Sequence, residues 1–448
     1  MPRTGFFIKI VRINGKWISF RQRRAGEEPG KEGIMLTKAP KGTKDILPGQ
    51  SSKWQYVEGL FRDICRTYGF EEIRTPMFEH TELFVRGVGD TTDVVEKQMY
   101  SFDDLAGRNI TLKPEGTSPA VRAFIENGLY AQAQPTKLYY ITACFRYEKM
   151  QKGRYRQFHQ MGVEIFGSES PMADAEVISL AKDMLEKSGM KELELRLNSV
   201  GCPECRPRHR EALKDFLRDR YEQLCETCKG RYEKNPMRIL DCKNENCRRL
   251  VENAPLMLDY LCDDCRAHFE KVKELLGEMG IAFVIDPWIV RGLDYYTKTA
   301  FEFVSTREMA QGTVCGGGRY DHLVEQLGGP GVPGVGFGMG EERLLLLLEE
   351  EKAALPVTEG VDYLLVTMGE RARKMAVKIA GRLRKNGRSA VCDMMDRSFK
   401  NQMKYANKIG AAKVIILGED EVEKGICSIK DMKTGEQVTI SADHVDNL

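Results

Sequence analysis

Three hydrophobic patterns follow one another along this chain. Residues 37–199 and 301–352 alternate helical apolar spacing with short β-rich runs. Between them, residues 202–277 are charged, rich in cysteine and helical in spacing, and after Pro356 strands and helices alternate regularly. The first pattern predicts an α+β layer on an antiparallel sheet, interrupted by a helical insertion. The last pattern predicts a small α/β domain with a mostly parallel sheet.

The expected elements can be located from apolar spacing and from flanking glycines. Helices are expected at residues 51–68, 173–188, 341–352, 371–386 and 398–409. Strands are expected at residues 70–76, 137–148, 158–166, 301–304, 334–339, 361–367, 389–394 and 413–417. The patterns divide the chain into an N-terminal extension at 1–34, a large domain at 35–357 that contains the insertion at 202–277, and a small domain at 358–448.

The composition is that of a globular protein that dissolves in water. Hydrophobic residues make up 42% and charged residues 30% of the 448 residues. The longest apolar run, Leu344–Leu348, is far shorter than the roughly 20 residues that span a bilayer, and no apolar signal-peptide segment follows the early basic residues. We therefore expect a cytoplasmic protein without a membrane partner. The net charge of +2 indicates no partner by itself.

The first 34 residues differ from the rest in charge. Eight Lys or Arg stand against three Glu, a local balance of +5. Two interpretations are a basic, disordered tail and an arm that binds RNA. We favour a third, in which translation starts at Met35, because Lys31-Glu32-Gly33 can be encoded by a purine-rich sequence that resembles a bacterial ribosome-binding site.

Eight of the thirteen cysteines lie between Cys202 and Cys265. They form three Cys-x2-Cys pairs and one Cys-x4-Cys pair, a spacing typical of zinc ligands in a reducing compartment. Spacing does not decide which pairs share an ion. One structural Zn²⁺ site is our first hypothesis, and the alternative is reduced thiols that pack as small apolar groups. The ligands of the hypothetical site are Cys225, Cys228, Cys262 and Cys265.

Five stretches contain residues suited to ligand binding. Arg146 lies on a strand that a basic loop joins to a second strand, and Arg343 lies in the first turn of a helix after a glycine-rich strand. Glycines let a backbone approach a flat ligand closely, and arginines bind phosphates through two parallel hydrogen bonds. Taken singly, each stretch also fits an ordinary turn or a solvated hairpin. The five are Leu112–Thr117, Phe145–Glu164, Val290–Thr297, Gly316–Asp321 and Gly334–Leu344.

In this order the stretches resemble the three signature motifs of class II aminoacyl-tRNA synthetases. Arg291–Tyr296 and Gly317–Asp321 are similar to segments peculiar to histidyl-tRNA synthetase, as are Lys41–Asp45 and Tyr405–Gly410. The resemblance runs from about Met35 to the C-terminus. It implies a class II catalytic domain on an antiparallel sheet, followed by an α/β anticodon-binding domain.

The resemblance implies an enzyme that condenses L-histidine with ATP in the presence of Mg²⁺ and then esterifies the terminal ribose of tRNA(His). The implied catalytic residues are Arg146 at the α-phosphate, Arg291 at the substrate carboxylate and α-phosphate, and Arg343 at the γ-phosphate. Their roles are electrostatic, because arginine stays protonated at neutral pH. The implied ATP-binding residues are Arg146, Glu148, Arg154 and Arg343.

The resemblance also implies a histidine site. Glu115, Thr117 and Gln160 match family positions that bind the α-amino group, and Glu164 and Tyr296 match those that hold the imidazole nitrogens. A carboxylate and a phenol can satisfy both ring nitrogens at once, and such a site rejects apolar isosteres without an editing domain. The full expected set is Glu115, Thr117, Gln160, Glu164, Arg291, Tyr295 and Tyr296.

Two regions are expected to contact tRNA. The loop at 149–156 resembles the motif that reaches the acceptor end, through Lys149, Gln151 and Arg156, although a charged loop without a specific partner has the same composition. Arg371–Lys408 contains twelve Lys or Arg and two Asp, a balance of +10 that would attract a phosphate backbone. The family uses this domain to bind the anticodon stem and loop.

The resemblance further implies a homodimer in which Thr75–Gly89 contributes to the subunit interface. Two alternatives belong to other functional classes. One is a synthetase-like regulatory subunit of histidine biosynthesis, which binds histidine without charging tRNA, and the other is a non-catalytic tRNA-binding protein. The basic C-terminal domain argues against the first, and the phosphate-binding arginines argue against the second.

Overall fold

The structure is a computed structural model that describes residues 7–13, 16–22, 37–90, 92–307, 312–357 and 360–447. Within the first two ranges, β1 (Phe7–Ile13) and β2 (Lys16–Gln22) pair as an antiparallel hairpin. The rest of the predicted 1–34 extension, with its proposed start signal, lies outside the described residues. Residues from Ile46 onward form a separate compact unit, which contains the remaining sheets.

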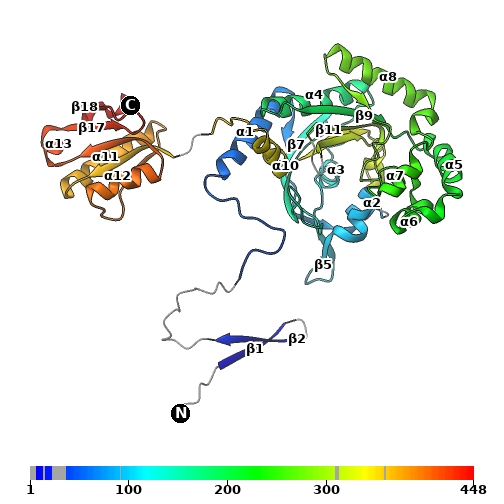
Figure 1. The fold of residues 1–448 in the computed structure, drawn as a ribbon, viewed down its shortest axis with the longest axis horizontal. Helices are drawn as coiled ribbons and strands as arrows, with labels where there is room; N and C mark the ends of the chain where they lie inside the picture. Colours follow the sequence, from blue (N-terminus) through cyan, green and yellow to red (C-terminus); the bar gives the residue numbers. More distant parts are fainter. Residues whose placement is uncertain are drawn as a thin grey trace. The chain divides into compact units, whose positions relative to one another are not determined.

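The large domain is built on an eight-stranded sheet whose six middle strands are antiparallel (Figure 1). Two short strands, β10 (Val284–Ile285) and β3 (Glu71–Glu72), run parallel to their neighbours at the two edges. The predicted α+β fold is thereby confirmed. The six middle strands, in spatial order, are β9 (Leu193–Ser199), β11 (Thr297–Ser305), β12 (Thr313–Arg319), β13 (Gly334–Gly340), β8 (Gln157–Phe166) and β7 (Thr136–Phe145).

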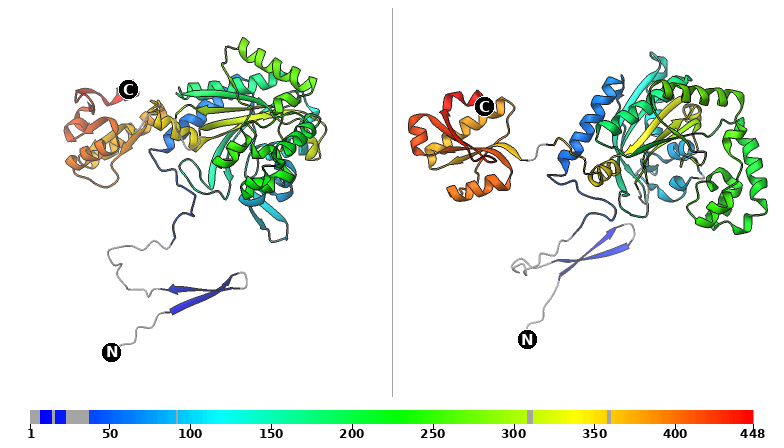
Figure 2. Two further views of the ribbon diagram at one scale, coloured as in Figure 1. Left: turned by 45° about the vertical axis from the view of Figure 1, so that its right-hand side comes forward. Right: turned by 45° about the horizontal axis from the view of Figure 1, so that its top comes forward.

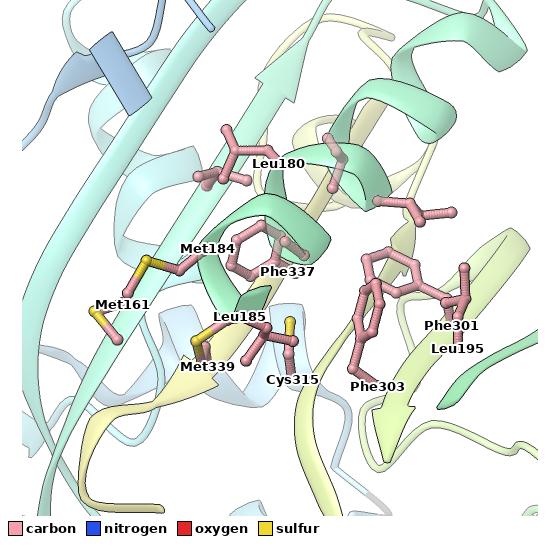
Figure 3. Close-up of a cluster of buried hydrophobic side chains, with 14 of the residues drawn as sticks. Met161, Leu180, Met184, Leu185, Leu195, Phe301, Phe303, Cys315, Phe337 and Met339 are labelled. Carbon is pink, nitrogen blue, oxygen red and sulfur yellow. The ribbon is translucent and has the colours of Figure 1, made fainter. Parts of the chain in front are cut away.

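One face of this sheet packs against helices to form the main core. Strand side chains alternate between two faces, so Phe337 and Met339 of β13 point to the same side and are fully buried there. Figure 3 shows Leu180, Met184 and Leu185 of α4 lying against these strand residues. The helices of this core are α1 (Ser51–Thr67), α4 (Pro171–Lys187), α8 (Asp263–Glu278) and α10 (Glu341–Glu350).

Beside the opposite face lie α3 (Thr117–Glu126) and α9 (Leu323–Gln326), which form a second core with Tyr295, Tyr296 and Tyr320. A small antiparallel sheet precedes α3 in sequence. Its strands are β4 (Phe78–His80), β6 (Asn109–Leu112) and β5 (Tyr100–Asp103), and α2 (Thr81–Val88) and the π-helix η1 (Val94–Gln98) lie between β4 and β5 in sequence.

The cysteine-rich segment is helical, as its sequence predicts. Short helices fold on a core of their own that includes Leu213, Leu217 and Ile239. Figure 2 shows these green helices gathered to one side of the eight-stranded sheet. The elements are α5 (Cys205–Arg218), η3 (Tyr221–Gln223), α6 (Glu226–Lys234), η4 (Pro236–Ile239), α7 (Glu245–Val251) and η5 (Met257–Tyr260), followed by α8.

The C-terminal domain is a five-stranded sheet between helices. Three strands are parallel, as the alternation of elements predicts, and two further strands, β17 and β18, extend the sheet in the antiparallel direction. Buried residues show that α11 and α12 cover opposite faces. The elements are β14 (Val361–Thr367), α11 (Glu370–Lys385), β15 (Ala390–Cys392), α12 (Phe399–Lys408), β16 (Ala411–Leu417), α13 (Glu419–Lys424), β17 (Ile426–Asp431), β18 (Gln437–Ser441) and η6 (Ala442–Asn447).

Among the residues described, no helix combines the length and the apolar character needed to cross a membrane.

An ion pair inside the large domain ties α4 to the sheet. Arg319, at the end of β12, is fully buried and pairs with Asp174 of α4, while its Nη1 donates to the carbonyl of Ser168 at 2.8 Å. Burial acts to raise the pKa of Asp174, but Arg319 and His268 outweigh it and hold that pKa at about 2. The carboxylate therefore stays ionised inside the protein, where it compensates the buried guanidinium.

Removing this carboxylate should destabilise the large domain strongly. Asp174→Asn removes the fully buried one of the two carboxylates that pair with Arg319 and leaves only the less buried Asp321, at 3.1 Å, so we expect the free energy of unfolding to fall by about 3 kcal/mol in urea denaturation. Glu186→Gln is a matched control on the same helix, because Glu186 pairs with Lys182 at the surface. Glu186→Gln should lower the free energy of unfolding by less than about 1 kcal/mol. Equal losses in the two variants would show that the buried pair contributes no more to stability than the surface pair.

Candidate active site

A cavity of about 720 Å³ lies where the sheet meets the insertion. Its lining includes all three predicted catalytic arginines, Arg146, Arg291 and Arg343, although they come from distant parts of the sequence. Glu148 and Arg154, predicted for ATP, also line it, as do six of the seven residues predicted for histidine. Those six are Glu115, Thr117, Gln160, Arg291, Tyr295 and Tyr296.

Glycines form the floor of this cavity. Gly316 of β12 lies opposite Gly338 of β13, which in turn lies opposite Gly162 of β8. A Cβ atom at Gly316 would come within 2.6 Å of the Arg291 guanidinium, and one at Gly338 within 2.2 Å of Gln160 Nε2. Side chains at these positions would therefore displace residues predicted to bind the substrates.

Arg146 follows β7 directly and is held beside the cavity by two contacts. Its Nε donates to the carbonyl of Pro114 at 2.7 Å, and its guanidinium lies 5.4 Å from the centre of the Phe158 ring. Further along the same hairpin, Arg154 pairs with Glu148 at 3.1 Å. The hairpin therefore presents two guanidinium groups and one carboxylate to the cavity.

Arg291 lies in the loop before β11 and forms an ion pair with Glu302 of that strand. Its guanidinium also lies 5.4 Å from the centre of the Tyr296 ring. Burial acts to lower the pKa of Arg291, but the charge of Glu302 outweighs this and raises it. The guanidinium is therefore a permanent positive charge at the cavity wall.

Arg343 lies in the first turn of α10, directly after the glycine-rich strand β13. Its Nη1 donates to the carbonyl of Thr313 at 2.6 Å. Burial, and then the nearby charge of Arg154, lower the pKa of Arg343. A cation that is desolvated and repelled by a second cation favours an anionic ligand, and a polyphosphate has the matching charge.

Glu115 and Gln160 are held rigidly at the other end of the cavity. The Glu115 carboxylate accepts hydrogen bonds from the backbone N–H groups of Thr117, at 2.7 Å, and Ser118, at 2.8 Å, and so caps α3. Gln160 Oε1 accepts from the N–H of Gly116 at 2.8 Å. These bonds position polar groups where an ammonium group could bind.

Glu164 is the predicted histidine-binding residue that does not line the cavity. It is fully buried on β8, where Oε1 accepts from the Tyr140 hydroxyl at 3.0 Å and Oε2 accepts from the Tyr320 hydroxyl. Burial, as the largest cause, raises the pKa of Glu164 to about 8. The structure thus places this carboxyl group beneath the cavity, neutral at pH 7 and bonded to two phenols.

The three residues predicted for the tRNA acceptor end do not line the cavity either. Lys149 and Gln151 are exposed in the loop between β7 and β8. Arg156 stacks on Tyr147, with 3.7 Å between its Cζ atom and the ring centre. The exposed positions leave Lys149 and Gln151 accessible to a large ligand.

Sequence reasoning missed the residues that support the predicted ones. Glu302, the partner of Arg291, alternates with the buried Phe301 and Phe303 on β11, a pattern that a glutamate facing solvent would share. Tyr140 and Tyr320, which hold Glu164, were not predicted as site residues, although Tyr320 lies in the stretch Gly316–Asp321 that the sequence marks for ligand binding. The contribution of the insertion was also missed, because nothing in its sequence indicates that Arg231, Arg238, Asp241 and Lys243 line the same cavity.

The comparison with known families agrees with this arrangement. Residues 42–344 match the family described as histidyl-tRNA synthetase. The chain belongs to the histidyl-tRNA synthetase family. Residues 357–448 match the anticodon binding domain, which accounts for the separate C-terminal sheet.

Curated members of the histidyl-tRNA synthetase family match this chain along almost their whole length. Histidine–tRNA ligase of Caldanaerobacter subterraneus subsp. tengcongensis is 59% identical over 412 residues, which cover 92% of this chain and 99% of the relative. Histidine–tRNA ligase of Thermoanaerobacter pseudethanolicus is 60% identical with the same coverage.

A solved family member has the same fold. The crystal structure of apo histidyl-tRNA synthetase from S. aureus superposes with a TM-score of 0.79 at 41% identity, covering 92% of this chain and 99% of that one. A structure from Bacillus halodurans, described as an ATP phosphoribosyltransferase regulatory subunit/histidyl-tRNA synthetase, gives a TM-score of 0.63 at 22% identity and covers 87% of this chain and 100% of that chain. The second similarity shows the fold alone.

The predicted zinc ligands are not brought together, which corrects the grouping proposed from the sequence. The structure places Cys262 and Cys265 in one cluster and Cys225 and Cys228 in another. The prediction failed because sequence spacing carries no information about which helix ends meet. We call the first the root cluster (Cys202, Cys205, Cys262 and Cys265) and the second the rim cluster (Cys225, Cys228, Cys242 and Cys247).

The burial of Glu164 predicts a specific dependence of stability on pH. Between the ordinary pKa of 4.5 and about 8, Glu164 is protonated in the folded chain and ionised in the unfolded chain. The folded state then binds more protons, so stability falls as pH rises through this window. Glu164→Gln removes this titration. Between pH 5 and pH 8, we therefore expect the free energy of unfolding to decrease with rising pH more steeply in the wild type than in the variant. The difference between the two slopes should be about 1.4 kcal/mol per pH unit.

Urea denaturation of both proteins between pH 5 and pH 8 measures this difference. The second buried carboxyl group, Glu341, has a pKa raised by burial to about 9 and titrates in both proteins, so it cancels in the comparison. Parallel pH profiles would show that Glu164 is ionised in the folded wild type.

Proposed function

We propose that this chain is a histidine–tRNA ligase. It activates L-histidine with ATP to histidyl-adenylate and transfers the histidyl group to tRNA(His), releasing AMP and diphosphate. The observation that carries the proposal is the convergence of Arg146, Arg291 and Arg343 on one glycine-floored cavity that also contains Gln160 and Tyr296. The names of the curated relatives support the same activity.

In the first step an oxygen of the histidine carboxylate attacks the α-phosphorus of ATP, and the bond from that phosphorus to the bridging oxygen of diphosphate breaks. Negative charge moves onto the leaving diphosphate, so catalysis consists of positioning and charge neutralisation. Arg146 would hold the α-phosphate, Arg343 the γ-phosphate, and Arg291 the substrate carboxylate beside the α-phosphate. Glu302 fixes the Arg291 guanidinium before substrate arrives, which avoids reorganisation during the reaction.

Glu148 and Arg154 would complete the ATP site. The carboxylates of Glu148 and Glu342 both line the cavity, and oxygen ligands of this kind suit Mg²⁺. We therefore infer that these two residues would hold Mg²⁺, which supplies further charge neutralisation for the triphosphate when bound. The protein itself contributes the fixed guanidinium groups and the flat glycine floor.

The histidine site follows from the polar groups at the other end of the cavity. Glu115, Thr117 and Gln160 would bind the α-amino group, Tyr296 would hold an imidazole nitrogen, and Tyr295 would lie beside the ring. Glu164 would hold an imidazole nitrogen only if its carboxyl group turned from Tyr320 toward the cavity. Its neutral, buried state supports a role in orienting the tyrosines as well, because a buried carboxyl group is costly unless its hydrogen bonds are satisfied.

Lys149, Gln151 and Arg156 would meet the tRNA acceptor end, and the C-terminal domain would bind the anticodon stem and loop. Exposed lysines on α12 support the second contact, since Lys400, Lys404 and Lys408 all face solvent. A row of exposed cations on one helix attracts a phosphate backbone.

We also propose a cytoplasmic homodimer with Thr75–Gly89 at its interface. Apolar side chains in this stretch are exposed in the single chain, with Phe78 54% and Met77 45% accessible, and Phe102 of the same small sheet is 47% accessible. Contiguous exposed apolar residues mark surfaces that a partner covers. Translation from Met35 stays a prediction from the sequence.

Exchange of labelled diphosphate into ATP tests the proposed activation step. We expect exchange with L-histidine and none with the other standard amino acids. Arg291→Lys should lower the exchange rate at least about 100-fold, because an ammonium group cannot replace a planar guanidinium that stabilises charge in the transition state. Arg66→Ala, an exposed position on α1, is the matched control and should leave the rate unchanged.

The outcomes separate the three functional classes. Histidine binding by calorimetry without exchange, in a protein that is folded by circular dichroism, would support the regulatory subunit instead. Binding of tRNA(His) with neither histidine binding nor exchange would support a tRNA-binding protein.

The contact with tRNA can be tested independently of activation. The double variant Lys400→Ala/Lys404→Ala removes two exposed cations from α12, so the slope of log KM for tRNA against log salt concentration should decrease by about 2. Lys424→Ala/Lys433→Ala changes the net charge equally away from α12 and should leave the slope unchanged. Diphosphate exchange should be normal in both. If the slope of log KM against log salt concentration decreased only in Lys424→Ala/Lys433→Ala, the tRNA would bind at those lysines and not at α12.

A further inference from the structure

The eight cysteines of the insertion gather into two separate clusters of four. In each cluster all four Sγ atoms lie within 4.8 Å of one another. Three of the eight are half-buried, and the other five are buried. No cysteine of either cluster is part of a disulfide. The two groups of thiols therefore share the geometry of a closed site, although they belong to two separate cores of the insertion.

The sulfur–sulfur distances fit a tetrahedral metal site. Cys202 Sγ lies 3.5 Å from Cys205 Sγ and 3.8 Å from Cys262 Sγ. In the rim cluster, Cys225 Sγ lies 3.9 Å from Cys242 Sγ. Four thiolates at a Zn–S distance of about 2.3 Å form a tetrahedron whose edges measure about 3.8 Å, while a disulfide bond is about 2.05 Å long.

Backbone N–H groups support the sulfur atoms in both clusters. The N–H of Cys262 donates to Cys205 Sγ at 3.1 Å, and the N–H of Cys225 donates to Cys247 Sγ at 3.3 Å. Hydrogen bonds of this kind orient metal ligands and stabilise negative sulfur. The same support, repeated in two clusters of unrelated sequence, distinguishes them from thiols that merely pack in a core.

We propose that the insertion binds two structural Zn²⁺ ions, one in the root cluster and one in the rim cluster. Each site is closed by four thiolates, so neither ion keeps a position for a substrate. Tetrahedral sulfur coordination suits zinc or iron, and zinc is the ion that brings no redox chemistry to a purely structural site. The spacing of two to four residues within each pair is that of structural zinc sites.

The zinc ion of the root cluster would connect the beginning of the insertion to its last helix. Cys202 and Cys205 stand where the chain leaves β9 and enters α5, and Cys262 and Cys265 stand at the start of α8. One ion therefore joins the first and last helices of the insertion. The apolar residues around it, Met257 and Leu261, form only a small core, so the ion supplies stability that packing alone does not.

The rim zinc connects the insertion to the active-site cavity. Cys225 and Cys242 line that cavity, and the ion would tie the start of α6 to the segment after η4. Between these two points in the sequence lie Asn235 and Arg238, which contact the loop that contains Arg291. Arg238 Nη1 donates to the carbonyl of Gly292 at 3.3 Å, and Asn235 Nδ2 donates to Asp294 at 3.0 Å. Loss of this ion should therefore loosen one wall of the cavity.

Elemental analysis of the full chain, purified without added metal, tests the proposal directly. We expect two zinc ions per chain in the wild type, and one in each of the variants Cys202→Ser/Cys205→Ser and Cys225→Ser/Cys228→Ser. Cys392→Ser, a cysteine outside both clusters, should keep two. A wild type with none or one, with iron in place of zinc, or variants that both keep two would overturn the proposal.

A measurement on the wild type alone guards against variants that do not fold. Titration with a mercurial thiol reagent and a zinc indicator should release two ions per chain as the cluster thiols react. Reaction of those thiols without zinc release would overturn the proposal.

Trypsin digestion tests the structural role of the rim ion. Cys225→Ser/Cys228→Ser should be cut between residues 229 and 243, while the wild type and Cys392→Ser resist. If the variant, the wild type and Cys392→Ser resisted trypsin equally, no bound ion would be needed to keep residues 229–243 folded. None of these three measurements depends on catalysis, so each can fail while the proposed ligase activity stands.

Discussion

The alternation of side chains along β12, β13 and β8 is the constraint on which the active site depends. Phe337 and Met339 point into the helical core, and Gly338 between them faces the opposite side and lines the cavity. A glycine in a strand interior costs about 0.5–1 kcal/mol relative to alanine, because it loses more conformational freedom on folding. Burial of a large apolar side chain on the neighbouring position contributes about 1.5–3 kcal/mol and offsets that cost. The strands can therefore be stable and still leave a bare floor for a ligand.

The charged groups above this floor are fixed by partners that have no part in the proposed chemistry. Glu302 holds Arg291, the carbonyl of Pro114 holds Arg146, and the carbonyl of Thr313 holds Arg343. Glu302 and Thr313 lie on β11 and β12 of the eight-stranded sheet, and Pro114 follows β6 of the small sheet. One carboxylate and two backbone carbonyls therefore hold the three guanidinium groups in place against their mutual repulsion.

Much of this could be predicted from the sequence, because long elements carry a periodic signal. The helix at 51–68 and the strand at 361–367 are observed within a residue of their predicted limits. The strand predicted at 70–76 is reduced to the two residues of β3, and β10 is equally short, too short to show any period. Among predicted site residues, Glu164 shows a further limit. Its place on a strand face was predictable, but the two tyrosine hydroxyls that keep its carboxyl group beneath the cavity come from β7 and from beyond β12. Only the folded sheet brings them together.

The loop that carries Arg291 joins three parts of the molecule that sequence reasoning treated separately. The N–H of Asp294 donates to the carbonyl of Val88 at the end of α2, within the stretch expected at the dimer interface. The insertion reaches the same aspartate through Asn235, and it reaches the segment after α2 through an ion pair between Arg231 and Asp93 at 2.9 Å. A shift in either the insertion or α2 would therefore move Asp294, and Arg291 lies only three residues away. Because a displacement of about 1 Å can reduce a rate 100-fold, the position of this arginine depends on the insertion and on α2 as well as on the sheet beneath it.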